Sequence, residues 1–318
     1  MDRRSWTLLL GLSAIWGASY LLIKVALRDL SPEMVAFTRI ALAALLLLPI
    51  AASRHALGPL RGHLGWMVVL GAVQVAGPFL LIAAGEQSIS SSLAGILVAT
   101  TPILTALLAL RLDHEERSEG KRLLGVGIGI AGVIALFGLD LTGSGSAVLG
   151  GLAVIVASLG YSIGGFIVKA RLAAVPSIGV VAGVMAASSL LLLPAAAATL
   201  PATAPSAGPL AAVVALGLFG TGLAFVVFYA LIGTVGPART MLVSYVAPGF
   251  AVIYGAWFLS EPITAGKVIG LALVLTGSWL GVGGRLRPGA GVPDAATAPP
   301  DGQPEAAEAR LRSAGATR

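Results

Sequence analysis

The sequence contains no cysteine and very little charge. Of its 318 residues only 11% are charged, whereas soluble globular domains carry about 25%. The absence of cysteine excludes disulfide bonds, thiolate metal sites and cysteine nucleophiles. With 57% hydrophobic residues and a mean hydropathy of +0.95, the composition also excludes an ordinary soluble domain.

The few charged residues are concentrated in short stretches. Eight of them lie between Arg111 and Arg122 and nine follow Gly284, whereas the stretch from Leu172 to Ala238 has none. An uncharged run of this length is sufficient for two bilayer crossings of about 20 residues each. The sequence therefore predicts a multi-pass integral membrane protein.

Ten apolar segments follow one another along the chain. A hydropathy window of about 19 residues places them near 5–25, 33–52, 64–84, 89–111, 122–139, 148–169, 178–199, 209–232, 238–259 and 267–284. Backbone polar groups must be satisfied inside a bilayer, so the segments are helices or strands of a closed barrel. Because they are continuously apolar rather than alternating, we expect an all-α protein with ten transmembrane helices.

The basic residues in the short loops predict the orientation. With the N-terminus inside, thirteen lysines and arginines fall on the cytoplasmic side, and only Lys24, Arg28 and Lys267 fall outside. The positive-inside rule therefore predicts a cytoplasmic (inner) membrane protein with both termini in the cytoplasm. The basic residues lie singly or in pairs, so we expect no nucleic-acid partner. Residues 285–318, rich in Pro, Ala and Gly, predict a disordered cytoplasmic tail.

The chain is an internal duplication. Offsets of 145 or 146 residues align nine features in order: Trp16 with Tyr161, Lys24 with Lys169, Pro49 with Pro194, Phe79 with Phe225, Ala84 with Ala230, Pro102 with Pro248, Glu116 with Glu261, Gly125 with Gly270, and Gly132 with Gly277. This predicts two repeats, 5–139 and 148–284. Five crossings per repeat invert the second copy, and inverted repeats are typical of secondary transporters.

Several of these residues form a known pattern. Trp16-Gly17, Arg39, and the repeated endings Pro102, Glu116-Arg117 and Pro248, Glu261-Pro262 resemble the EamA-type ten-helix members of the drug/metabolite transporter superfamily. The resemblance covers residues 8–284 and implies transport of small metabolites, amino acids among them. Tyr161-Ser162 departs from the pattern, because the first half has Trp16-Gly17 at that place.

Two prolines lie inside apolar segments at matched positions. Pro102 and Pro248 each remove a backbone donor, which frees the carbonyls of Val98 and Ser244. One interpretation is that these carbonyls line a solute cavity, with Ala247-Pro248-Gly249 as the stronger break. The other is a tolerated kink whose carbonyls are bonded by neighbouring hydroxyls.

Arg39 is a cation inside the second segment. A charge at this depth needs a partner, an anionic substrate or a route to the interface. A structural role, such as bonding carbonyls or pairing with Glu33, and contact with the substrate are both open. Lys24 lies near the external end of the first segment, and we expect it to extend to water.

Polar-tipped side chains away from segment ends are candidates for a solute pocket. We expect the cavity between the halves, lined by helices one, three, four, six, eight and nine. The candidate substrate-path residues are Trp16, Tyr20, Arg39, Gln74, Thr101, Pro102, Tyr161, Ser244, Tyr245 and Pro248.

No candidate catalytic, metal or cofactor site is apparent. Gly127-Ile128-Gly129-Ile130-Ala131-Gly132 matches a dinucleotide fingerprint but lies in an apolar helix, where small residues favour close packing. Glu116 and Glu261 lie at segment ends, where capping of the following helix explains them better than proton coupling. We therefore expect no enzyme.

The function that the sequence predicts is secondary transport of a small metabolite, such as an amino acid or a related solute, by alternating access. A proton-coupled cationic drug exporter is the alternative, disfavoured because no segment has a central carboxylate. A membrane sensor and an intramembrane enzyme are further alternatives. Besides the lipid bilayer and a small-molecule substrate, we expect no partner except a second copy in a homodimer; a monomer is equally compatible. No motif specifies the substrate, the direction or the coupling ion.

Overall fold

The computed structural model describes residues 1–112, 120–140 and 145–281, and in this part of the chain all regular structure is helical. The predicted tail 285–318 and Glu116 lie outside the described residues. The helices of the first half are α1 (Arg3–Ala26), α2 (Pro32–Ser53), η1 (Gly58–His63), α3 (Leu64–Leu70), η2 (Gly71–Ala76), α4 (Gly77–Glu86), α5 (Ser91–Val98), α6 (Thr101–Leu112) and α7 (Lys121–Leu139).

The second half has a similar order. Its helices are α8 (Gly145–Arg171), α9 (Ser177–Ala198), α10 (Ala207–Gly217), η3 (Leu218–Leu223), α11 (Ala224–Val235), α12 (Pro237–Thr240), α13 (Val243–Leu259) and α14 (Ala265–Gly281). Several of these join end to end, so η1 to α4 form one stretch, Gly58–Glu86, and α10 to α11 form another, Ala207–Val235.

Seven of the described helical stretches are long and apolar enough to cross a membrane, and three shorter ones are also apolar. These stretches lie at the predicted segments. The shorter ones, Leu123–Leu139, Val243–Leu259 and Ala265–Gly281, each have 17 residues. At a rise of about 1.5 Å per residue they approach, but do not exceed, a hydrocarbon core of about 30 Å. An all-helical membrane protein is therefore confirmed.

Two long helices contain π-helical turns. The first is η2 (Gly71–Ala76) and the second is η3 (Leu218–Leu223). They occur 147 residues apart, close to the offset of the sequence repeat. Such turns insert an extra residue into a helix and are frequent at functional sites.

The two prolines affect their helices differently. The fourth segment is divided into α5 and α6 at Ala99–Thr100, and Pro102 is the second residue of α6, where a missing donor costs little. In contrast, α13 continues through Pro248. The expectation that Ala247-Pro248-Gly249 is the stronger break was therefore wrong: α13 begins only at Val243, and its interruption precedes the proline.

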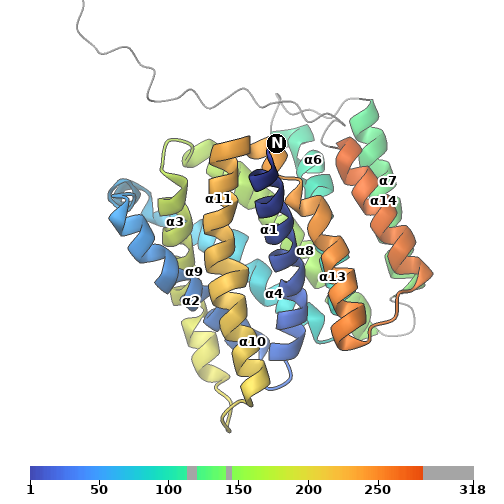
Figure 1. Ribbon diagram of the computed structural model, residues 1–318, viewed down its shortest axis with the longest axis horizontal. Helices are drawn as coiled ribbons and strands as arrows, with labels where there is room; N and C mark the ends of the chain where they lie inside the picture. Colours follow the sequence, from blue (N-terminus) through green and yellow to red (C-terminus); the bar gives the residue numbers. More distant parts are fainter. Residues whose placement is uncertain (113–119, 141–144, 282–318) are drawn as a thin grey trace, which may run out of the picture. The chain divides into compact units, whose positions relative to one another are not determined.

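The helices pack in matched pairs. The most extensive contacts join α7 with α14 and α2 with α9, while α1 packs on α13, α10 and α11, and α8 packs on α4, α5 and α6 (Figure 1). The first helix of each repeat is thus surrounded mainly by helices of the other repeat. The hydrophobic core consequently extends through both halves.

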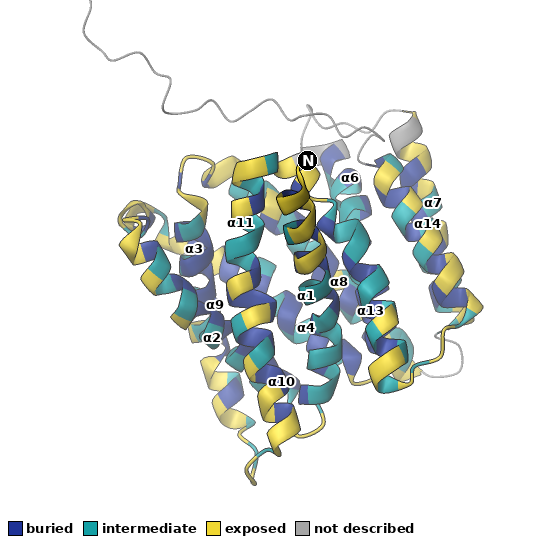
Figure 2. Ribbon diagram, in the orientation of Figure 1, coloured by how far each residue is buried: buried dark blue, intermediate teal, exposed yellow. Residues whose placement is uncertain are grey.

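Apolar side chains also cover the outside of the helices. Leu45, Leu190, Ile134 and Trp257 are 65–78% exposed, and exposed residues follow the outer faces in Figure 2. A soluble monomer rarely exposes so much apolar surface. This surface is suited to contact with lipid.

Candidate functional site

Arg39 is buried in the interior of the bundle, on α2, whose other charged residue, Glu33, lies in the first turn. Its side chain is 8% exposed, its Nε donates a hydrogen bond of 2.7 Å to Thr221 Oγ1 on η3, and its guanidinium carbon lies 3.8 Å from the ring centroid of Phe79. An ion pair with Glu33, one of the roles that the sequence left open, is not formed. A hydroxyl and an aromatic face contact this cation directly, and the Glu86 carboxylate acts on it only through space.

Phe79 and Phe225, which align in the sequence repeat, make matching ring contacts. Trp16 on α1 meets Phe225 edge-to-face at 6.3 Å and 70°. Tyr161 on α8 meets Phe79 at 6.5 Å and 71°. Each pair joins one repeat to the other. The two aligned phenylalanines therefore each make an edge-to-face contact with an aromatic residue of the other repeat. Their being phenylalanine does not by itself lead to this match.

Trp16 and Phe225 make further aromatic contacts. Trp16 also lies 5.3 Å from Phe228, and Phe225 stacks on Tyr229 at 6.4 Å. Tyr20, Tyr161 and Glu86 lie close enough to Arg39 for a charge on any of them to act on the guanidinium. We call Trp16, Tyr20, Arg39, Phe79, Tyr161, Thr221 and Phe225 the central cluster. It contains four of the ten predicted path residues.

The hydroxyls near Pro102 bond the carbonyls that the break leaves free. Thr101 Oγ1 donates to Val98 O at 2.7 Å, and Thr100 Oγ1 donates to Leu97 O at 2.6 Å. Ser162 Oγ on α8 also contacts Thr101 O at 3.1 Å. These bonds agree with the interpretation of a tolerated kink. Thr101 and Pro102 lie against α8 and are not part of the central cluster.

The remaining predicted path residues lie at separate places. Gln74, in η2, packs against Gly164 of α8. Tyr245 directs its hydroxyl to Ser278 O on α14 at 3.4 Å. Ser244 and Pro248 belong to the first two turns of α13, and Pro248 is buried. None of these four joins the central cluster.

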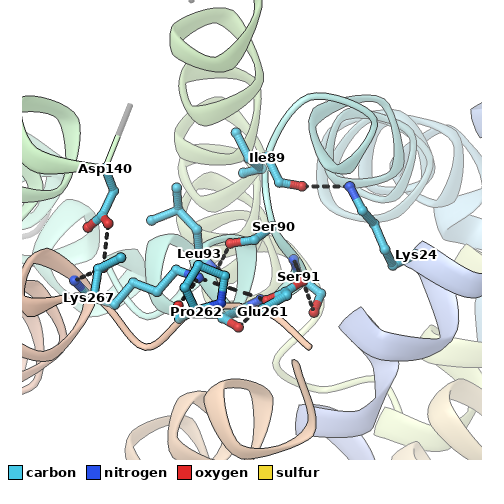
Figure 3. Close-up of polar contacts among 11 residues, drawn as sticks. Lys24, Ile89, Ser90, Ser91, Leu93, Asp140, Glu261, Pro262 and Lys267 are labelled. Atoms are coloured by element: carbon cyan, nitrogen blue, oxygen red, sulfur yellow. Dashed lines mark hydrogen bonds and ion pairs between the residues drawn. The ribbon is translucent and has the colours of Figure 1, made fainter. Parts of the chain in front are cut away.

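A second group of polar residues closes one end of the bundle (Figure 3). Glu261, in the loop between α13 and α14, accepts hydrogen bonds from Ser91 N and Ser91 Oγ at 2.7 and 2.9 Å. It also accepts bonds from Ser92 N, at 3.0 Å, and from Ser92 Oγ. A carboxylate at this place satisfies the free donors of the first turn of α5.

The expected environment of Glu261 was therefore partly wrong. Its side chain is only 10% exposed, and it caps a helix of the other repeat rather than the helix that follows it. Burial raises the pKa of Glu261, but the hydrogen bonds from Ser92 and Ser91 outweigh this effect and hold it below its ordinary value. The ionised form therefore stabilises this contact between the repeats.

Lys24 completes the same end of the bundle. Its ammonium group donates to Glu86 O and, at 2.8 Å, to Ile89 O. The expectation that Lys24 extends to water was thus wrong, because the carbonyls that follow α4 lie within reach. Near α14, Thr264 Oγ1 donates to Asp140 Oδ1, and Lys267 Nζ lies 4.0 Å from Glu261. We call Lys24, Glu86, Ser91, Ser92, Asp140, Glu261, Thr264 and Lys267 the polar end.

Sequence reasoning did not single out several members of these groups, among them Thr221, Glu86 and Phe79. Thr221 lies in an apolar run, and only its flanking glycines, Gly220 and Gly222, suggest a close approach. Glu86 falls between the predicted segments 64–84 and 89–111. Its side chain is fully buried at the end of α4. Phe79 was noted only as part of the repeat.

One pocket opens away from the polar end. It has a volume of about 130 Å³ and is lined by Ile50, Arg54, Ile178, Val226, Tyr229 and Ala230. These residues belong to α2, α9 and α11, so only one of its three helices was among those expected to line a cavity. Tyr229, which lines the pocket, stacks on Phe225 of the central cluster.

Comparison with known proteins identifies the family. The model of the EamA-like transporter family matches residues 4–138 and again residues 148–282. The chain belongs to this family. It is therefore a member of the drug/metabolite transporter superfamily, and the predicted family resemblance is confirmed.

Its relatives are transporters. The chain is 31% identical over 271 residues to the uncharacterized inner membrane transporter YedA of Escherichia coli K12, covering 83% of this chain and 85% of the relative. It is 24% identical over 294 residues to a probable amino-acid metabolite efflux pump of the same organism, covering 89% and 96%. A membrane transporter with a small-molecule substrate is therefore the supported function.

A solved structure shares the fold of this EamA-type chain. A crystal structure matches with a TM-score of 0.64 and 20% identity, covering 88% of this chain and 98% of the other. At this identity the match supports the arrangement of the helices only.

Proposed function

We propose that this EamA-type protein is a secondary transporter with ten transmembrane helices in two inverted repeats, 5–139 and 148–284. The observation that carries this proposal is the matched pair of aromatic contacts, Trp16 with Phe225 and Tyr161 with Phe79. Both pairs cross between the repeats with nearly the same distance and angle. A pseudo-two-fold arrangement around the central cluster accounts for this equivalence.

Packing supports the same symmetry. The second helices of the repeats, α2 and α9, pack on one another, as do the last ones, α7 and α14. Such self-pairing is what a two-fold axis in the membrane plane produces, and transporters of this architecture bind solutes near the midplane between repeats. Alternating access then proceeds by movement of one repeat against the other.

Arg39 favours a substrate with a carboxylate or another anionic group. It is a buried cation for which the described residues provide no ion-pair partner, beside aromatic rings that suit an apolar side chain. The name of the amino-acid metabolite efflux relative agrees with a solute of this class. A cationic drug is correspondingly disfavoured, because Arg39 would repel it.

The test is transport by the purified protein. Metabolites of cells that overproduce the protein, compared with those of cells lacking it, provide candidate solutes for uptake into proteoliposomes. We expect Trp16→Ala and Tyr161→Ala to insert normally and to lower transport about tenfold or more, since substrate-positioning contacts have effects of this size. Leu45→Ala, on the exposed outer face, is the matched control. Unchanged transport by both aromatic variants would contradict the proposed path.

A further inference from the structure

Glu86 is a carboxyl group sealed inside the polar end. It is the last residue of α4 and has no exposed surface. Neither of its carboxylate oxygens has a hydrogen-bond partner in the described part of the chain. Native proteins rarely leave such a group buried without partners, so its environment requires an explanation.

The charged neighbours of Glu86 leave it unpaired. Lys24, on α1, uses its ammonium group to bond the backbone carbonyls of Glu86 and Ile89 rather than the carboxylate. The other charged groups that interact with Glu86 are Arg39 of α2, which is bonded to Thr221, and Glu261, which is of like charge.

Other elements around α4 contribute little. On α1, the Tyr20 hydroxyl interacts with Glu86 only electrostatically. The stretch of α8 that packs against Gly85, Gly150–Val154, has no titratable side chain, and neither does η2 or α5. On α8 the nearest titratable group is Tyr161, whose ring contacts Phe79, two turns before Glu86. The cations Lys24 and Arg39 act on Glu86 only through space, and no described group forms an ion pair or a hydrogen bond with its carboxylate.

An ionised carboxylate in such a place is strongly disfavoured, and protonation removes the unpaired charge. Resting on the proposed alternating-access function, we propose that Glu86 is a proton-binding site that must be occupied before the polar end can close. The carboxyl takes its proton from water while the polar end is open. It releases that proton when movement of the repeats next exposes it to water.

The contacts of Glu261 join the second repeat to the chain segment that directly follows Glu86. Glu261 of the second repeat holds Ser91 and Ser92 of the first repeat, and these serines begin the helix that follows the Glu86 turn. Separation of Glu261 from Ser91 and Ser92 would uncover the start of α5. Proton binding at Glu86 and movement of the repeats therefore both act on the turn between α4 and α5.

The test measures closure directly and needs no substrate. The purified full chain has no cysteine, so a single Ala94→Cys reports opening, because Ala94 on α5 has 0% exposure. The readout is a ratio of two rates: the rate at which Ala94→Cys reacts with a thiol reagent, divided by the rate for Ser88→Cys. Ser88 is exposed at the same end, so the ratio corrects for the effect of pH on thiol reactivity. With Glu86 present, the ratio should rise with pH between about pH 5 and pH 9, by up to about tenfold per unit over part of this range.

Variants of the carboxyl decide the outcome. In Glu86→Gln the ratio should stay low at every pH, whereas Glu86→Asp, which restores a titratable group, should recover the rise. Glu33→Gln, a carboxylate in the first turn of α2, is the matched control and should behave like the parent. A rise that persists in Glu86→Gln, a ratio independent of pH in the parent, or a dependence on Na⁺ at constant pH would overturn the proposal.

The result is independent of solute transport. If proteoliposomes show no transport of any candidate solute but the ratio depends on pH through Glu86, the proposed transport function fails and the proton site stands. If transport is observed and the ratio is the same with and without Glu86, the proton site fails alone.

Discussion

At the residue scale, few polar groups occupy the apolar interior, and they determine where the helices contact one another specifically. Arg39 is bonded to Thr221 and lies over Phe79, while Glu261 is held by Ser91 and Ser92. In a bilayer, apolar packing does not distinguish a neighbouring helix from lipid, so hydrogen bonds and close packing determine which helices associate. The bond of Arg39 to Thr221 and the bonds of Glu261 to Ser91 and Ser92 join the repeats, so we expect them to affect both stability and motion.

Thr221→Val should destabilise the protein without changing its charge. The substitution removes the acceptor for Arg39 Nε, and hydrogen bonds between transmembrane helices contribute about 0.6–1.7 kcal/mol. We expect a lower melting temperature of the purified protein, measured by thermal aggregation in detergent. Thr234→Val is the control, because Thr234 bonds only carbonyls of its own helix. An equal decrease for both variants would show that the bond to Arg39 has no special weight.

The contact of Glu261 should depend on pH. Because the pKa of Glu261 is lowered in the folded state, its ionised form stabilises that state above the ordinary carboxyl pKa of about 4.3, and this contribution is lost as pH falls through the lowered value. Glu261→Gln should therefore melt below the parent at neutral pH. At low pH, after Glu261 is protonated, the difference should decrease. A difference that is constant with pH would argue against a role of the charge.

At the element scale, glycines determine how closely two helices approach. Along α7 and α14, a methyl group built on Gly277 would lie 2.4 Å from Gly129 N and 2.6 Å from Gly125 O. The glycine run that resembles a dinucleotide fingerprint is thus part of a helix contact, as the sequence indicated. The repeated Gly132 and Gly277 belong to the same contact.

Gly277→Ala should separate α7 from α14. Overpacking against a backbone typically costs about 1–3 kcal/mol, so we expect a lower melting temperature and less protein in the membrane. Gly127→Ala is the matched control, because a methyl group there meets nothing within 4 Å. In a helix, alanine is favoured over glycine by about 0.5–1 kcal/mol, so the control should be unchanged or slightly more stable. A destabilised control and a stable Gly277→Ala would contradict this packing.

At the scale of the whole molecule, the helix bundle has two ends, and each end is expected to face one side of the membrane. The polar end contains Lys24, Glu86 and Glu261. The turn after α2, with Arg54 and Arg61, lies at the other end of that helix. The excess of basic residues predicts that the second end is cytoplasmic.

Single cysteines should report these two sides. Ile263→Cys, 59% exposed near the polar end, should react with an impermeant thiol reagent in intact cells. Arg61→Cys, exposed in η1, should react only after permeabilisation. Reaction of both or neither in intact cells, with both reactive after permeabilisation, would contradict the predicted topology.

The helical class, the positions of the segments and the family could be predicted from the sequence. These follow from hydropathy, loop charge and repeated motifs, which are local properties or comparisons along the chain. The sequence also singled out Trp16, Tyr20, Arg39 and Tyr161 as path candidates, because polar-tipped side chains in apolar segments are conspicuous, and their role in transport stays a prediction.

Which residues meet follows only from the tertiary structure. Glu261 caps a helix of the other repeat, Lys24 bonds carbonyls instead of extending to water, and Glu86, which falls between two predicted segments, is buried at the end of α4. Glu261 and Ser91 are 170 positions apart in different repeats, and Lys24 and Ile89 are 65 positions apart within the first repeat. Hydropathy measures how well a segment dissolves in lipid, but it does not specify the partners of a polar group inside the bundle.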